Sequence, residues 1–172
     1  DDKSAQTASV KFRISGLYCM ERQQDLRDAA SQLTDITLSE IDYEKGEVTF
    51  SYDAGKVLKN AKPDQVKSHI DNLLKQVSRQ TFGIMPLSAI QREKLQRVDI
   101  TVAVLDCKAC GLGLYRAVSQ IPGVEQAFAE YKTGQIIAWV DPEKADRAKI
   151  IQALNQREII VREMEVDKVE KK

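Results

Sequence analysis

Residues 98–113 read Val-Asp-Ile-Thr-Val-Ala-Val-Leu-Asp-Cys-Lys-Ala-Cys-Gly-Leu-Gly, and the fold assignment starts from this stretch. Apolar and polar side chains alternate at its beginning, which predicts a strand from Val98 to Leu105. Apolar residues at helical spacing follow, which predicts a helix from Cys110 to Gln120. Cys107 and Cys110 are therefore expected on one loop and the first turn of one helix.

The start of a helix favours thiolates over thiols, because its unpaired N–H groups and its dipole both stabilise negative charge there. Two such thiols within reach of each other either chelate a soft metal ion or cycle between a dithiol and a disulfide. Three cysteines in the whole chain allow at most one internal disulfide.

The same order of elements occurs twice along the chain. In both halves it reads strand, helix, strand, strand, helix, strand. We therefore expect an α+β protein of two ferredoxin-like βαββαβ sandwich domains, each an antiparallel sheet with two helices on one face. In the first half we predict strands near 10–14, 36–41, 48–52 and 81–85 and helices near 20–33 and 63–74. In the second half we predict strands near 98–105, 124–128, 136–140 and 159–161 and helices near 110–120 and 145–155, the last capped by Asp141-Pro142.

The limits of the domains, the linker and the tails follow from the composition of each segment. We expect a flexible tail over 1–8, a first domain over 9–86 and a second domain over 97–166. Helix-forming residues after Ser88 predict a helical linker over 87–96, and a charged tail occupies 167–172.

Composition excludes several classes of function. The 172 residues carry no net charge, so neither a nucleic acid nor an anionic membrane is an expected partner. No apolar run approaches the roughly 20 residues of a membrane span. The chain starts at Asp1 with a polar stretch, which leads us to expect export to the periplasm or the extracellular space, with a cytoplasmic location as the alternative.

The second half resembles the heavy-metal-associated domains that occur in tandem in copper chaperones, metal-pumping ATPases and periplasmic mercury-binding proteins. Their signature, Gly-Met-Thr/Asp-Cys-x-x-Cys, aligns with residues 104–110, where Val104 and Leu105 replace Gly and Met. The segment Ile121-Pro122-Gly123-Val124 also resembles the family's entry into its second strand. This resemblance implies binding and trafficking of a transition-metal ion, with a metal-donor or metal-acceptor protein such as a transporter as partner. A homodimer is left open.

The first half is a degenerate copy in this alignment. Gly16 and Cys19 match the motif, but Arg22 stands where the second cysteine is expected. A guanidinium cannot ligate a metal, so this copy lacks the chelate. Cys19 is then a buried small hydrophobe, the remnant of a lost site, or a third sulfur for the Cys107/Cys110 pair.

Asp106 bears on which metal is bound. Two sulfurs alone suit Cu(I), whereas zinc takes four ligands. A carboxylate directly before Cys107 adds a hard oxygen and a negative charge, and family members with Asp here resemble the zinc- and cadmium-handling branch. We therefore expect Zn²⁺ or Cd²⁺ ahead of Cu⁺. Asp106 suits an N-cap equally well.

Two other functions remain open at this stage. The cysteine pair could be a redox dithiol, or both cysteine loops could be vestigial in a module that binds proteins without metal. The sequence shows no Ser/His/Asp set, no paired carboxylates and no phosphate-binding glycine loop, so we do not expect an enzyme.

Overall fold

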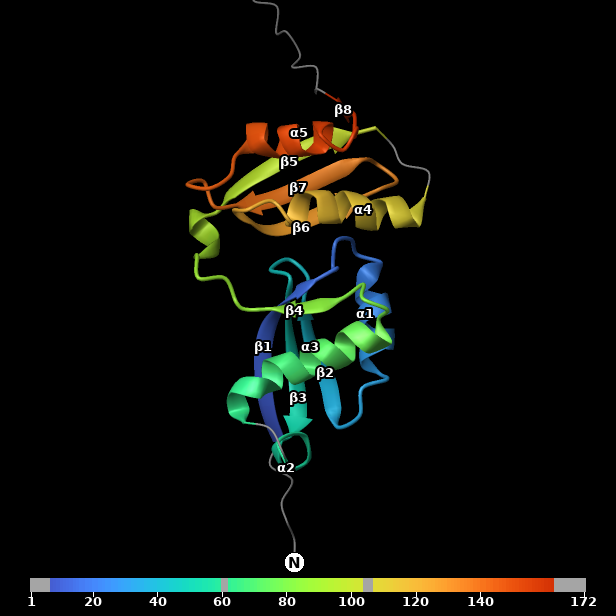
Figure 1. Cartoon of the computed structure of the whole chain (residues 1–172), viewed down its shortest axis with the longest axis vertical. Coiled ribbons are helices and arrows are strands. Elements are labelled where there is room, and N and C mark those ends of the chain that lie inside the picture. Colours follow the sequence, from blue (N-terminus) through green and yellow to red (C-terminus); the bar gives the residue numbers. More distant parts are fainter. Residues whose placement is uncertain (1–6, 60–61, 104–106, 163–172) are drawn as a thin grey trace, which may run out of the picture. The chain divides into compact units, whose positions relative to one another are not determined.

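The computed structural model describes residues 7–59, 62–103 and 107–162, and the chain divides into two compact units between Ala89 and Ile90. Each unit contains one four-stranded antiparallel sheet and its helices (Figure 1). The predicted fold class, two ferredoxin-like α+β domains, is confirmed. In the described ranges, no helix combines the length and the apolar character that crossing a bilayer requires.

The first unit has the strand order β2-β3-β1-β4, in which consecutive hydrogen-bonded neighbours are antiparallel. Its core forms where one face of the sheet meets the apolar sides of the helices, with Leu26, Phe50 and Ile70 fully buried. The elements are β1 (Thr7–Ser15), α1 (Arg22–Ala30), β2 (Ile36–Asp42), β3 (Glu47–Asp53), α2 (Ala54–Val57), the 3-10 turn η1 (Pro63–Gln65), α3 (Val66–Val77) and β4 (Gly83–Met85).

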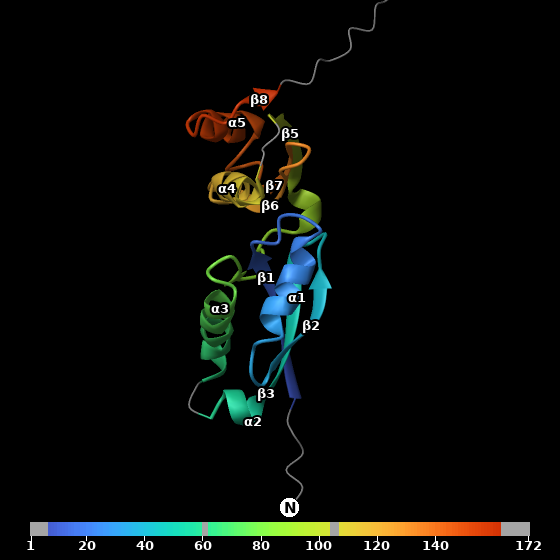
Figure 2. The same ribbon diagram turned by 90° about the vertical axis from the view of Figure 1, so that its right-hand side faces the viewer.

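The second unit repeats this topology with the order β6-β7-β5-β8. Figure 2 shows α4 and α5 on the same side of their sheet, where Leu114, Ile136 and Ile150 are buried. The elements are the 3-10 turn η2 (Arg92–Lys94), β5 (Gln96–Val102), α4 (Lys108–Ser119), β6 (Val124–Glu130), β7 (Gln135–Val140), α5 (Arg147–Asn155) and β8 (Val161–Arg162).

The two hairpins show how closely the copies match. The β2–β3 turn contains Gly46 with φ 64°, and the β6–β7 turn contains Gly134 with φ 72°. Positive φ is readily adopted by glycine, and a Cβ on Gly134 would lie 2.2 Å from the carbonyl oxygen of Val102. Each glycine therefore suits the tight turn that joins a pair of antiparallel strands.

Two predicted boundaries are wrong. Thr7 and Ala8 pair with Asp53 and Tyr52 in the sheet, so the first strand begins inside the predicted flexible tail 1–8. The linker 87–96 is not a helix, because its only helical element is the single 3-10 turn η2. The guanidinium of Arg92 lies 3.6 Å from the ring centroid of Trp139 and also bonds Gln126, so contacts with the second sheet outweigh helix propensity. The charged tail 167–172 lies outside the described residues.

The cap of α5 also differs from the prediction. Asp146, rather than Asp141, is the N-cap, and its Oδ1 accepts a hydrogen bond from the Lys149 N–H at 2.8 Å. Asp141 is buried in the preceding turn, where it bonds the Lys144 ammonium at 3.0 Å and the Glu143 N–H at 3.0 Å. These hydrogen bonds hold the pKa of Asp141 below its usual value, and the bond from Lys144 has a larger effect than the bond from the Glu143 N–H.

Candidate metal centre

Cys107 and Cys110 lie together at the N-terminus of α4. Cys107 is the N-cap residue with extended backbone (φ −142°, ψ 147°), and its Sγ accepts a hydrogen bond from the Cys110 N–H at 3.2 Å. Cys107 is exposed and Cys110 is half-buried. The two sulfurs are joined in a disulfide, and the Cα atoms are 5.3 Å apart. The sequence therefore predicted correctly that this pair meets at the start of a helix.

Asp106, the third residue of the predicted site, lies outside the described residues. The N-cap position, which was one interpretation of Asp106, belongs to Cys107 instead. A cysteine sulfur can take this role because the N–H groups of the first turn lack helical partners and need an acceptor. The same N–H would stabilise a thiolate at Cys107 once the disulfide is reduced.

The described residues supply no further ligands around this pair. No group of three or more histidines, cysteines, aspartates or glutamates in residues 7–59, 62–103 and 107–162 could hold a metal ion. Two sulfurs fit Cu(I), which accepts low coordination, while Zn²⁺ or Cd²⁺ needs two more donors. Those donors would come from water, from a second protein, or from Asp106.

Cys19 lies in the loop between β1 and α1 of the first unit and is only 7% exposed. Gly16 opens this loop with φ 93°, and a Cβ there would lie 2.0 Å from the carbonyl oxygen of Thr81. The loop is therefore closed against the α3–β4 connection, so the Cys19 thiol cannot meet an ion in solvent unless the loop moves. Of the three interpretations of Cys19, burial as a small apolar side chain describes its surroundings.

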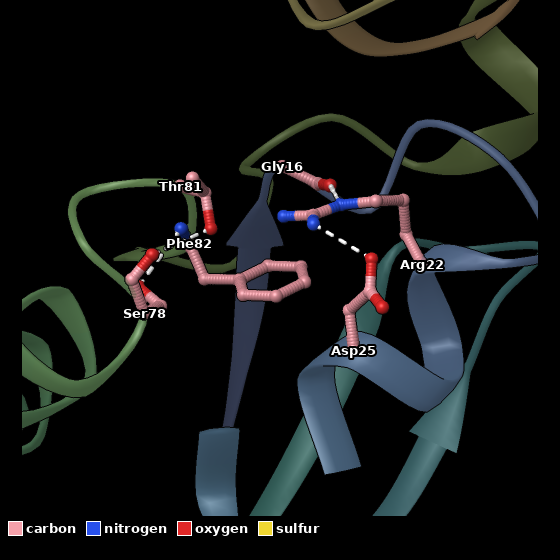
Figure 3. A network of polar contacts seen from close by, with 6 residues as sticks. All are labelled: Gly16, Arg22, Asp25, Ser78, Thr81 and Phe82. Carbon is pink, nitrogen blue, oxygen red and sulfur yellow. Dashed lines mark hydrogen bonds and ion pairs between the residues drawn. The ribbon is translucent and has the colours of Figure 1, made fainter. Parts of the chain in front are cut away.

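Arg22, which aligns with Cys110 of the second unit, holds this loop (Figure 3). Its Nε donates to the Gly16 carbonyl at 3.1 Å, and its Nη1 pairs with Asp25 at 2.9 Å. The guanidinium carbon lies 4.0 Å from the centroid of the Phe82 ring. A permanent cation thus stands in the first unit at the position that aligns with Cys110 in the second.

The ring of Phe82 is itself held by the α3–β4 connection. The Phe82 N–H donates to Ser78 Oγ at 3.2 Å, and Thr81 Oγ1 donates to the Ser78 carbonyl at 2.8 Å (Figure 3). Nη2 of Arg22 is buried and has no hydrogen-bond partner in the described part of the chain. Its favourable contact is with the face of the Phe82 ring. The sequence did not predict the stacking of Arg22 on Phe82, because the two residues lie far apart along the chain.

The three cysteines should differ in how fast their thiols react. In the reduced, folded protein we expect a chromogenic disulfide reagent to react rapidly with Cys107 and Cys110, because one is exposed and the other half-buried at a helix start. Cys19 should react only after a denaturant is added, because it is buried. Rapid reaction of all three thiols under native conditions would contradict the closed loop of the first unit.

No protein-family model matches this sequence, and no curated protein matches it. Solved structures similar to this chain include the following three. Oxidized MerP from Ralstonia metallidurans is 24% identical, with a TM-score of 0.37, over 40% of this chain and 94% of its own. The CopZ metallochaperone is 21% identical, with a TM-score of 0.37, over 39% and 100%. The water-soluble region of the P-type ATPase CopA from Bacillus subtilis is 12% identical, with a TM-score of 0.39, over 98% and 99%. The strand orders β2-β3-β1-β4 and β6-β7-β5-β8, and not these TM-scores, define the fold of the two units.

Proposed function

We propose that this protein binds a transition-metal ion through the reduced Cys107/Cys110 pair and passes it to another protein. The observation that supports this most directly is the position of the two sulfurs at the exposed start of α4. A pair three residues apart, with Cα atoms 5.3 Å apart, can direct both sulfurs at one ion. The proposal assigns binding and handover, and no catalysis.

The disulfide must first be opened. A thiol reductant supplies two electrons, the S–S bond breaks, and each sulfur takes up a proton or remains a thiolate. Metal binding then releases the remaining thiol protons, because only thiolates are ligands. The N–H of Cys110 and the N-terminal end of α4 lower the cost of holding this negative charge.

An exposed, incomplete site is suited to transfer. With two protein ligands, the ion keeps open coordination positions at which the thiols of an acceptor protein can enter before either original bond breaks. A closed four-ligand site has no such positions, which is typical of structural zinc sites. The expected partner is therefore a metal donor or acceptor, such as a transporter, that presents thiols of its own.

We propose Zn²⁺ or Cd²⁺ as the preferred ion, with Cu⁺ as the alternative. The reason is the sequence position of Asp106, whose carboxylate could add a hard ligand to the two sulfurs. Cu⁺ needs no such ligand and is satisfied by soft sulfur donors.

Competition against a chromogenic chelator tests both parts of the proposal. Freshly reduced protein should take up about one equivalent of Zn²⁺ or Cd²⁺, and the disulfide form should take up none, because a disulfide offers no thiolate. Replacing Asp106 with threonine should weaken Zn²⁺ binding at least about tenfold, corresponding to about 1.4 kcal/mol, and leave Cu⁺ binding nearly unchanged. Equal effects on both ions would remove the divalent preference, and no uptake by reduced protein would favour a protein-interaction module without metal.

The disulfide itself favours a second candidate function, thiol–disulfide exchange. Against this, β6 and β7, the two strands that follow α4, are antiparallel and joined by a tight hairpin at Gly134, whereas a thioredoxin core requires a parallel crossover. The reduction potential decides between the two. A value near those of cellular dithiol catalysts, together with disulfide exchange on a model substrate, would support the redox function.

A further inference from the structure

A groove of about 340 Å³ lies between α1 and the edge strand β2 of the first unit. Four apolar side chains line it, two of them buried and two half-buried, and exposed Arg27 and Thr37 lie beside them. This volume is within the range of small ligand sites, roughly 300–1,000 Å³. The apolar residues are Ala30, Leu33, Ile36 and Leu38.

The second domain serves as an internal comparison. The alignment that sets Arg22 against Cys110 also sets Arg27 against Tyr115 and Ala30 against Val118. Tyr115 is 7% exposed and Val118 is fully buried, so large side chains fill these positions in the second copy. In the first copy the same two positions carry a smaller side chain and a charged one, which leaves space beside β2.

The strand along this groove has an open edge. β2 lies at the end of its sheet and is hydrogen-bonded to β3 alone among the described strands. Alternate residues of an edge strand direct their N–H and C=O groups away from the sheet, where an added strand can pair with them. A bulge between Leu38 and Glu40 interrupts this edge, so residues 36–38, which line the groove, form a regular stretch separate from residues 40–42.

Arg27 supplies the charge at this site. The carboxylates near it in sequence are engaged elsewhere: Asp25 pairs with Arg22, Asp28 bonds Gln24, and Asp35 pairs with Lys56. In the described part of the chain, no carboxylate forms an ion pair with the Arg27 guanidinium. An exposed, unpaired arginine beside an apolar groove is suited to a ligand that carries both a carboxylate and an apolar side chain.

We propose that this groove binds an extended peptide segment of a partner protein. The segment adds as a strand to β2, places an apolar side chain between Ala30 and Leu38, and sets an acidic side chain or a terminal carboxylate against Arg27. Strand addition with a pocket for alternate side chains is an established mode of peptide recognition. This inference does not depend on the metal site and assigns the first domain a binding role of its own.

A phage-displayed library of short random peptides, selected on the full-length protein, provides the probe. We expect enrichment on the natural chain and none on a variant that carries the second-domain residues, Arg27→Tyr with Ala30→Val, once thermal melting shows that the variant is folded. The enriched peptides should share a carboxylate next to an apolar residue. Enrichment that is equal on both proteins, absent from both, or dominated by basic peptides would overturn the proposal.

A selected peptide, made synthetically, then tests the details by titration. Arg27→Glu should weaken its binding at least tenfold, because the variant sets like charges against each other, while Arg157→Glu, an exposed charge reversal in the second unit, should leave binding unchanged. In NMR spectra the amide signals of residues 36–38 should shift on peptide addition. Peptide binding that is insensitive to Arg27→Glu, or that shifts only amides elsewhere, would place the peptide outside this groove and contradict the proposal.

Discussion

Replacing both Cys107 and Cys110 with serine is expected to abolish metal uptake by the reduced protein. The hydroxyls of serine stay protonated at neutral pH and offer no soft donor, so the ion would lose both proposed sulfur ligands. The affinity for Zn²⁺, Cd²⁺ or Cu⁺ should fall by at least about a thousandfold, which corresponds to about 4 kcal/mol of binding free energy. Competition with a chromogenic chelator measures this directly.

Cys19→Ser is the matched control for this experiment. It also removes one thiol, but from a buried loop of the first unit, so metal uptake should be nearly unchanged. Circular dichroism should show that both variants retain their secondary structure. An equal loss of metal affinity in Cys19→Ser would indicate a site of three sulfurs and contradict the two-sulfur account.

Replacing Arg22 with alanine is expected to destabilise the first domain by about 2–3 kcal/mol. The substitution removes the stacking on Phe82, estimated at up to about 2 kcal/mol where the cation is desolvated, and the charge-assisted hydrogen bond to the Gly16 carbonyl. The ion pair with Asp25 adds little, because Asp25 is 56% exposed. The substitution also removes the buried Nη2, which lacks a hydrogen-bond partner in the described part of the chain, and this makes the net loss of stability smaller. Amide hydrogen exchange should show weaker protection in β1 and β3.

Two further variants separate the contributions of Arg22. Asp25→Ala should cost less than about 1 kcal/mol, since it breaks only an exposed ion pair. Arg22→Lys keeps the charge but lacks the planar group that stacks on the ring and bonds Gly16 at once, so its stability should lie between those of Arg22→Ala and the natural chain. A fully stable Arg22→Ala would show that the loop does not depend on this residue.

The fold could be predicted from the sequence because its local signals agree with one another. Alternating residues in β1 and β5, helical spacing in α3 and α4, and glycines at both hairpin turns all point to the same order in each half. The duplication strengthened this prediction, since each copy served as a test of the other. Such agreement between local pattern and overall topology is typical of sequences that specify one fold.

The errors arose where a tertiary contact decides the local structure. Residues after Ser88 have good helix propensity, yet Arg92 stacks on Trp139 and the segment forms a single 3-10 turn. Asp141 resembles an N-cap in sequence, but its ion pair with Lys144 holds it in a turn before the helix begins at Arg147. The short helix α2 was missed because its four residues show no periodicity.

In the candidate site too, local spacing was predictable from the sequence, whereas contacts between distant residues were not. The spacing of Cys107 and Cys110 at a strand-to-helix junction was sufficient to predict that the sulfurs meet. That Cys107 itself caps α4, and that Arg22 stacks on a ring from the α3–β4 connection, depends on backbone geometry and on residues distant in sequence. The groove beside β2 depends on small differences between the copies, such as Ala30 in place of Val118, which become informative only when the fold aligns them.

X-ray absorption at the zinc edge of the reduced, full-length protein, loaded with Zn²⁺ at less than one equivalent, tests the proposed site most directly. The account predicts two sulfur neighbours at about 2.3 Å, with nitrogen or oxygen atoms at about 2.0–2.2 Å completing the coordination. A first shell of nitrogen and oxygen atoms alone would show that the ion lies elsewhere and would contradict the assignment of Cys107 and Cys110 as the metal ligands.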